Sequence, residues 1–135
     1  MATDAHLEGL TLAVADITRS VEFYGEKLGF AVEVNGPRFA MIRVGGPTGG
    51  TIGLLSMETA DASGARNWTP EQRAAIHVEL SSDDIDTLYE QLTARGVHFA
   101  SPPHDEPWER SMHTYDPDGY TVEFAQGLRG HNTPS

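Results

Sequence analysis

The order of predicted elements occurs twice along the chain, and this repeat is the strongest constraint on its fold. In each half, a strand is followed by a helix and then by three strands. When the halves are aligned, the dipeptide Asp16-Ile17 falls on Asp84-Ile85. The segment "TIGL" at 51–54 falls on "TVEF" at 121–124, with a slightly larger shift. Such a duplication predicts two similar βαβββ modules that share a core or a cleft.

The first module is expected to span about residues 6–57. It opens with an alternating strand in "EGLTLAVA". The helix "DITRSVEFYGEKLGF" follows, with Asp16 or Thr18 as its N-cap and Gly29 as its end. Strand-like runs at "FAVEV", "FAMIRVG" and "TIGLLSM" complete the module, separated by glycine and proline.

The second module is expected to span about residues 74–126. The strand "AAIHVELSS" precedes a helix that ends at Gly96, and "HFASPPHDEPWERS" reads as a short strand and a proline-rich loop. A final hairpin closes the module. Residues 58–73 lack periodicity and read as a linker, and the tail 127–135 is expected to be disordered. We interpret residues 1–135 as a single domain of the α+β class.

Composition excludes several classes of function. The chain has no cysteine, so disulfides, thiolate metal sites and cysteine nucleophiles are excluded. Twenty acidic residues against nine basic ones give a net charge of -11, which repels nucleic acid and anionic membranes and favours cationic ligands. We expect no nucleic-acid or membrane partner. The opening residues do not resemble a signal peptide, so a cytoplasmic location is expected.

The turn signal "DPDG" predicts the register of the last hairpin. If Asp116 pairs with Tyr120, counting outward places His113 opposite Glu123. Directly opposed residues lie on one face of a sheet, with Cβ atoms roughly 5 Å apart. We therefore expect both side chains to share a polar face, either as a solvated cross-strand pair or as half of a site.

His77 is expected on that same face. In the strand before the second helix, Ile76, Val78 and Leu80 point to the core, so His77 and Glu79 point to the opposite side. Two imidazoles and a carboxylate form an ordinary ligand set for a divalent transition metal. His77, His113 and Glu123 are thus the candidate metal ligands. The ion, if one binds, would be iron, manganese, nickel, zinc or cobalt.

At this point the pattern resembles a known family. The segments "LTLAVADITRSVEFYGEKLGF" and "HVELSSDDIDTLYEQLTARGV", together with "DPDGYTVEF", are similar to the vicinal oxygen chelate superfamily, which includes glyoxalase I, bleomycin-resistance proteins and extradiol dioxygenases. The resemblance covers about residues 6–126. It implies paired βαβββ modules, forming a curled mixed sheet around a cleft, and assembly as a homodimer.

The resemblance also implies positions for metal ligands. In metal-dependent members, ligands lie on the first and last strands of each module. The second-module positions match His77 and Glu123, whereas the first-module positions match Gly9 and Gly53. Alignment of the two halves of the chain leads to the same two glycines. The first module therefore contributes no ligand, which makes glyoxalase I activity a poor match.

Three functions stay open at this stage. The first, which we favour, is binding or sequestration of a small cationic or aromatic molecule, as in the bleomycin-resistance members. In that interpretation the two glycines, Gly9 and Gly53, open room in the cleft, and three aromatic residues stack on the ligand: Trp68, Trp108 and Tyr115. We expect Trp108 to lie on a flap formed by "PPHDEPWER".

The other two functions are enzymatic. A metal held by His77, His113 and Glu123 would polarise an oxygen substrate as a Lewis acid, in lyase, isomerase or dioxygenase chemistry. A metal-free enzyme would instead use His77 with Glu123 as an acid–base pair, with Glu123 as the catalytic carboxylate. Nothing in the sequence selects between these reactions.

Overall fold

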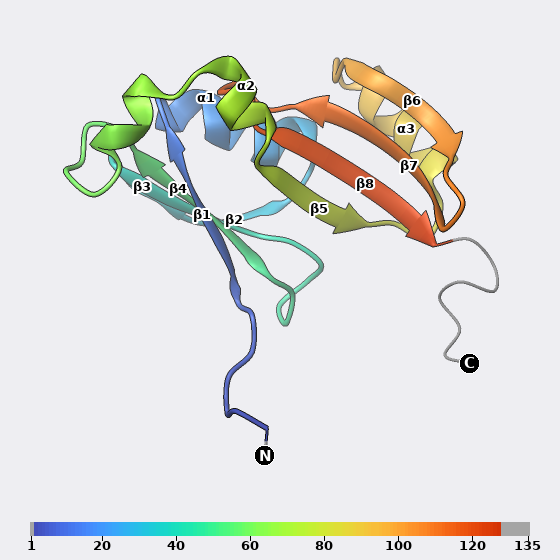
Figure 1. Cartoon of the computed structure of the whole chain (residues 1–135), viewed down its shortest axis with the longest axis horizontal. Coiled ribbons are helices and arrows are strands. Elements are labelled where there is room, and N and C mark those ends of the chain that lie inside the picture. Colours follow the sequence, from blue (N-terminus) through green and yellow to red (C-terminus); the bar gives the residue numbers. More distant parts are fainter. Residues whose placement is uncertain (1, 128–135) are drawn as a thin grey trace. The chain divides into compact units, whose positions relative to one another are not determined.

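The protein forms two four-stranded mixed sheets, one in each of two compact units that divide between Trp68 and Thr69 (Figure 1). The computed structural model describes residues 2–127. The first unit contains β1 (Gly9–Val14), α1 (Ile17–Val21), the π-helical segment η1 (Glu22–Lys27), β2 (Ala31–Asn35), β3 (Phe39–Arg43), β4 (Thr51–Ser56) and the 3₁₀ helix η2 (Ser63–Asn67). The second contains α2 (Pro70–Ala74), β5 (His77–Ser81), α3 (Ile85–Ala94), β6 (Phe99–Asp105), β7 (Glu109–Tyr115) and β8 (Thr121–Gly127).

The strand order confirms the repeat. The sheets have the orders β1-β4-β3-β2 and β5-β8-β7-β6, so each unit is a βαβββ module. In both sheets the first strand runs parallel to the last, and the remaining pairs are antiparallel. Gly9 pairs with Thr51 in the first unit, and His77 pairs with Thr121 in the second, which are the positions that the sequence repeat aligns. The predicted α+β fold is confirmed.

Each sheet buries one face against its own helix. In the second unit Val78, Met112, Val122 and Phe124 are buried, and α3 contacts β6, β7 and β8. The residues between them along each strand face the other way, because successive strand side chains alternate. Burial of one large apolar side chain contributes roughly 1.5–3 kcal/mol, so this alternation fixes which face is core. The side chains on the face away from α3 are more exposed than those of the core.

The helix boundaries follow their capping residues. Asp16 accepts a hydrogen bond from the backbone N–H of Arg19, and Asp84 caps α3 in the same way. Gly29 and Gly96 follow the two helices with φ of 81° and 91°, a conformation that suits glycine. Of the two caps predicted for the first helix Asp16 is the one observed, and the predicted ends at Gly29 and Gly96 are confirmed.

The segment predicted as a linker contains the division between the two units, but it is partly ordered. Four successive backbone hydrogen bonds each join an N–H to the carbonyl three residues earlier. The donors are Thr59, Ala62, Ala65 and Trp68, and the first acceptor is Ser56. This is the period of a 3₁₀ helix, which a search for helical or strand periods misses. Helix α2 then begins at a capping box in which Thr69 and Gln72 bond reciprocally.

The proline-rich stretch is a strand and not a loop, which corrects a second prediction. Strand β6 runs through Pro102 and Pro103, with register shifts on either side of Ser101. Proline has no N–H to donate. Because β6 is at the edge of its sheet, a proline whose nitrogen faces away from β7 costs no hydrogen bond between strands. The flap expected around Trp108 is reduced to the short turn between β6 and β7.

Two further expectations concern the ends and the membrane. Gly127, placed in the predicted disordered tail, is the last residue of β8, and the rest of the tail lies outside the described residues. In the part of the chain from 2 to 127, no helix is long and apolar enough to cross a membrane.

Candidate functional site

The hairpin between β7 and β8 has the register that its turn predicts. Asp116 N–H donates to the carbonyl of Tyr120 at 2.9 Å, and Gly119 adopts φ 92°. The buried carboxylate of Asp116 accepts two backbone hydrogen bonds across the turn, from Asp118 at 2.9 Å and from Tyr120 at 3.0 Å. This fixes His113 directly opposite Glu123, as predicted.

The parallel pairing of β5 with β8 shows where Glu79, expected on the same face as His77, lies relative to the last strand. Glu79 lies directly beside Glu123, so a row of polar residues crosses all four strands: Glu79, Glu123, His113 and Ser101. His77 lies on the same face two positions along β5, where it pairs with Thr121. The three candidate ligands thus share one sheet face, with a second carboxylate among them.

A cavity of about 550 Å³ covers this face of the second unit. Four glutamates line it: Glu79, Glu106, Glu109 and Glu123. Three histidines line it as well: His77, His104 and His113. Ser101, Ser111 and Trp108 complete it, and Trp108 is 59% exposed. The structure therefore brings His77, His113, Glu123 and Trp108 together, as the sequence suggested.

The charges in the cavity perturb one another. Burial raises the pKa of Glu123, and the carboxylates of Glu109 and Glu79 raise it further against the opposing effect of His77. Burial lowers the pKa of His113, and nearby histidines lower it further. In the stretch from 2 to 127, the carboxylates of Glu79, Glu109 and Glu123 have no hydrogen bond or ion pair. The cavity thus contains three carboxylates that no hydrogen bond or ion pair holds.

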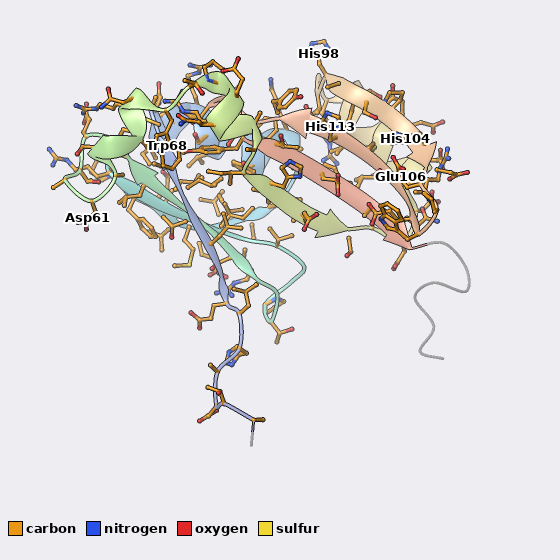
Figure 2. All side chains as sticks on the ribbon, viewed as in Figure 1. Asp61, Trp68, His98, His104, Glu106 and His113 are labelled. Atoms are coloured by element: carbon orange, nitrogen blue, oxygen red, sulfur yellow. The ribbon has the colours of Figure 1, made fainter. Side chains whose placement is uncertain are left out.

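His104 is the exception, because its ring is held by acceptors. Its Nδ1 lies 2.8 Å from the carbonyl oxygen of Pro102 and 2.9 Å from Oγ of Ser101, and its Nε2 lies 3.2 Å from Oε1 of Glu106 (Figure 2). The Pro102 carbonyl raises the pKa of His104, and Glu106 raises it further, against partial desolvation and Arg110. Glu106 therefore has a partner in His104, whereas the other three glutamates have none in the described structure.

The sequence profile of the Glyoxalase/Bleomycin resistance protein/Dioxygenase superfamily matches residues 5–124 of this chain. The match covers both modules and the whole cavity. The chain belongs to this superfamily.

Individual members of the superfamily support the assignment. The Bacillus subtilis (strain 168) protein YraH, which is uncharacterized, is 31% identical over 126 residues, covering 88% of this chain and 96% of its own. The crystal structure of a glyoxalase/bleomycin resistance protein/dioxygenase from Nocardioides is 33% identical, with a TM-score of 0.78, covering 100% of this chain and 91% of that one. TnmS3, an antibiotic binding protein from Streptomyces sp. CB03234, shares the fold at 23% identity, with a TM-score of 0.74 over 95% of this chain and 100% of its own.

Divalent metals are common in this superfamily, but the side chains here do not fit one as they are placed. A Cβ on Gly9 would overlap the carbonyl oxygen of Thr51, and a Cβ on Gly53 would lie 2.8 Å from Oγ1 of Thr11. A side chain at Gly9 is therefore blocked by backbone atoms, whereas one at Gly53 would require the side chains of Thr11 and Phe39 to move. Among the residues with described positions, no three His, Asp or Glu side chains are grouped closely enough to hold an ion.

The same contacts correct the interpretation of the two glycines. They were expected to open room in a cleft, but the space beside each is filled. Thr51 fills it at Gly9, and Thr11 with the ring of Phe39 fills it at Gly53. The sequence shows only that a side chain is missing, and neighbouring strands occupy its place.

The remaining predicted cleft residues lie outside the cavity. Tyr115 is beside it on β7, 46% exposed, with its ring in an edge contact with His113 at a centroid distance of 5.5 Å. Trp68 belongs to the first unit, where it lines a separate cavity. Of the three predicted aromatic residues, Trp108 alone contributes to this cavity in the described structure.

The unpaired charge of Glu123 leads to a prediction on stability. Because its pKa is raised above the ordinary 4.5, the folded protein holds this proton more tightly than the unfolded chain does. The free energy of unfolding therefore falls as pH rises from 4.5 through the higher pKa of Glu123 in the folded protein. Glu123→Gln removes this pH-dependent loss of stability. Two like charges directly opposite destabilise a sheet by roughly 0.2–1 kcal/mol, so we expect a gain of this size at pH 7.

Urea unfolding in EDTA-containing buffer at pH 7 and pH 4 measures this gain. It should be present at pH 7 and largely lost at pH 4, where the carboxylate is mostly protonated in both states. Glu90→Gln, on α3 and outside the cavity, is the matched control and should change neither value. A Gln variant less stable than wild type at pH 7 would show that Glu123 has a stabilising partner.

Proposed function

We propose that the protein binds and sequesters a small cationic organic molecule, with an aromatic part, in the cavity of its second unit. The observation that carries the proposal is the lining of this cavity: four glutamates, three of them without a partner in the described structure, beside the exposed Trp108. A volume of about 550 Å³ is in the usual range for small-molecule sites.

The chemistry of the lining favours a cation over an anion or a neutral molecule. A positive group beside Glu79 and Glu123 would relieve the repulsion between these two carboxylates. The face of an indole attracts cations, contributing about 0.5–2 kcal/mol. The net charge of -11 also raises the local concentration of cations at the surface.

The superfamily includes binding proteins, which agrees with this proposal. TnmS3 binds an antibiotic, and its fold is the fold of this chain. Because its identity to this chain is low, the cationic class of ligand rests on the cavity alone. Glyoxalase I activity is a poor match, because the first-module positions expected to hold its metal ligands are Gly9 and Gly53.

A cationic dye tests the proposal directly. Proflavine, a planar aromatic cation, should bind saturably by isothermal titration calorimetry, and the anionic dye 1-anilinonaphthalene-8-sulfonate should bind this cavity much more weakly. A unit charge at about 4 Å in water contributes about 1 kcal/mol, so Glu79→Gln and Glu123→Gln should each weaken proflavine about fivefold. Trp108→Ala should weaken it about three- to tenfold.

The control again is Glu90→Gln, which changes the net charge equally but lies on the helix face. Affinity that falls equally in this variant would show that proflavine responds to overall charge, which would refute a site. Raising the salt concentration should weaken binding in wild type more than in the Glu79→Gln/Glu123→Gln double variant.

The alternative function is a divalent-metal-dependent lyase, isomerase or dioxygenase that uses His77, His113 and Glu123. These residues do line one cavity, which is the observation in its favour. Elemental analysis of tag-free protein, before and after loading with Mn, Fe(II), Co, Ni or Zn, decides between the two. Near-stoichiometric metal that is lost in His77→Ala and Glu123→Ala would replace the binding proposal with the enzyme. The acid–base alternative predicts catalysis without metal that is lost in Glu123→Gln.

Assembly as a homodimer and a cytoplasmic location complete the proposal, and both derive from the family resemblance and the sequence. Light scattering after size-exclusion chromatography tests the first. A molar mass near 14.7 kDa, the mass of one chain, would refute the dimer.

A further inference from the structure

The first unit has a cavity of its own, of about 410 Å³, on the sheet face away from α1. Its floor is formed by Thr11 and Ala13 on β1 and by Leu55 on β4. Ala13 and Leu55 are directly paired across the two strands, whereas Leu12 and Val14 on either side of Ala13 are buried in the core. The floor is thus small and mostly apolar.

The roof of this cavity is held rigidly by the consecutive 3₁₀ turns. Ala62 and Ala65, which line the cavity, are 7% and 4% exposed, and each both donates and accepts one of the bonds three residues apart. The side chain of Thr59 adds a hydrogen bond to the carbonyl of Ser56 at 2.7 Å. These hydrogen bonds hold the backbone beside Ala62 and Ala65 in the turns that line the cavity.

Trp68 ends this series of turns and forms a wall. Its N–H donates to the carbonyl of Ala65 at 3.1 Å, and its side chain lines the cavity while remaining 39% exposed. A large indole at the edge of a small-residue cavity offers a flat surface for stacking. Asp61, labelled with Trp68 in Figure 2, also lines the cavity but is exposed to solvent.

The repeat shows how far the two cavities have diverged. In the alignment of the two modules, Thr11 occupies the position of Glu79, and Gly53 occupies the position of Glu123. The two carboxylates that repel one another in the second unit are therefore absent from the equivalent strands of the first. Only Asp61 is charged among the residues that line the first-unit cavity.

We propose that this first-unit cavity is a second binding site, which takes a flat, uncharged aromatic molecule stacked on Trp68. It differs in class from the site proposed for the cationic ligand. The duplicated modules thus offer one acidic and one apolar aromatic site in a single chain. The proposal stands on the first unit alone and does not require the second site to bind anything.

The neutral dye N-phenyl-1-naphthylamine tests the proposal by its increase in fluorescence on binding. Ala13→Leu fills the floor of the cavity without removing a contact, and should weaken the dye at least tenfold. Ser81→Leu makes the same change at the equivalent position of the second module and should leave the dye unaffected. Trp68→Ala, which removes the stacking surface, should weaken the dye about three- to tenfold.

The outcomes separate this site from the proposed function. Dye binding that falls in Trp108→Ala or Ser81→Leu but not in Ala13→Leu would place the dye in the second unit and overturn the proposal. The absence of saturable dye binding to the wild-type protein would overturn it too. Circular dichroism of each variant shows that the fold is kept, and unchanged proflavine binding in Ala13→Leu shows that the second unit is intact. If the wild-type protein binds N-phenyl-1-naphthylamine but not proflavine, only the proposed function is refuted.

Discussion

Replacing Asp116 by alanine is expected to lower the free energy of unfolding by about 3 kcal/mol, since hydrogen bonds to charged groups contribute roughly 1.5–3 kcal/mol each. The carboxylate is 5% exposed and accepts from the backbone N–H groups of Asp118 and Tyr120. Both donors lie in the turn that joins β7 to β8. Without an acceptor they lose their protein partners, and part of the cost is recovered where water reaches them. Urea unfolding followed by circular dichroism measures the loss.

The consequence reaches the site because this turn sets the register of the hairpin. If the turn loosens, His113 and Glu123 no longer lie opposite one another, and proflavine affinity should fall although Asp116 is not in the cavity. Asp116→Asn retains the Oδ1 acceptor and is the matched control, with an expected loss of about 1 kcal/mol from the weaker neutral acceptor. A stability of Asp116→Ala within about 0.5 kcal/mol of wild type, the usual range for surface substitutions, would contradict this account of the turn.

The features predicted well from the sequence are those that a local signal fixes. The pairing of His113 with Glu123 follows from a short turn, because the turn leaves one register for the strands on either side. The cap at Asp16 is equally local. The two modules were predicted because the repeat is a comparison of the chain with itself.

The features missed depend on neighbours that are distant in the sequence. Glu79 lies beside Glu123 through a parallel pairing of β5 with β8, and no turn connects those strands. His104 was assigned to a loop because two prolines precede it, whereas an edge strand with bulges accommodates them.

The segment before α2 shows a further limit of pattern reading. Thr59, Ala62, Ala65 and Trp68 recur every three residues, but three of the four are small and add little to a hydrophobic pattern. Their period is visible once a 3₁₀ helix is considered. Several residues of this segment line the first-unit cavity, and of them the sequence analysis named Trp68 alone.

The second large effect is expected for Gly9→His, which places a superfamily-type metal ligand in the first module. The new Cβ would overlap the carbonyl oxygen of Thr51 and lie 2.7 Å from its carbonyl carbon. Both atoms belong to the backbone of β4, which cannot rotate away as a side chain can. Forced overpacking typically costs about 1–3 kcal/mol, and we expect the upper part of this range because β1 must separate from β4. Urea unfolding measures the loss.

Two other glycines make this prediction specific to the contact with Thr51. Gly53→Ala meets mainly side chains, Oγ1 of Thr11 at 2.8 Å and the ring of Phe39 at 3.3 Å, so rotation should limit its cost to about 1 kcal/mol. Gly64→Ala meets nothing within 4 Å and should be neutral or slightly stabilising. The prediction is wrong if Gly9→His is as stable as wild type and binds stoichiometric zinc. That result would show that the backbone of β4 moves aside at little cost. The close approach of β1 and β4 would then not prevent a metal ligand at position 9. The absence of a side chain at Gly9 would be the reason that the first module offers no ligand there.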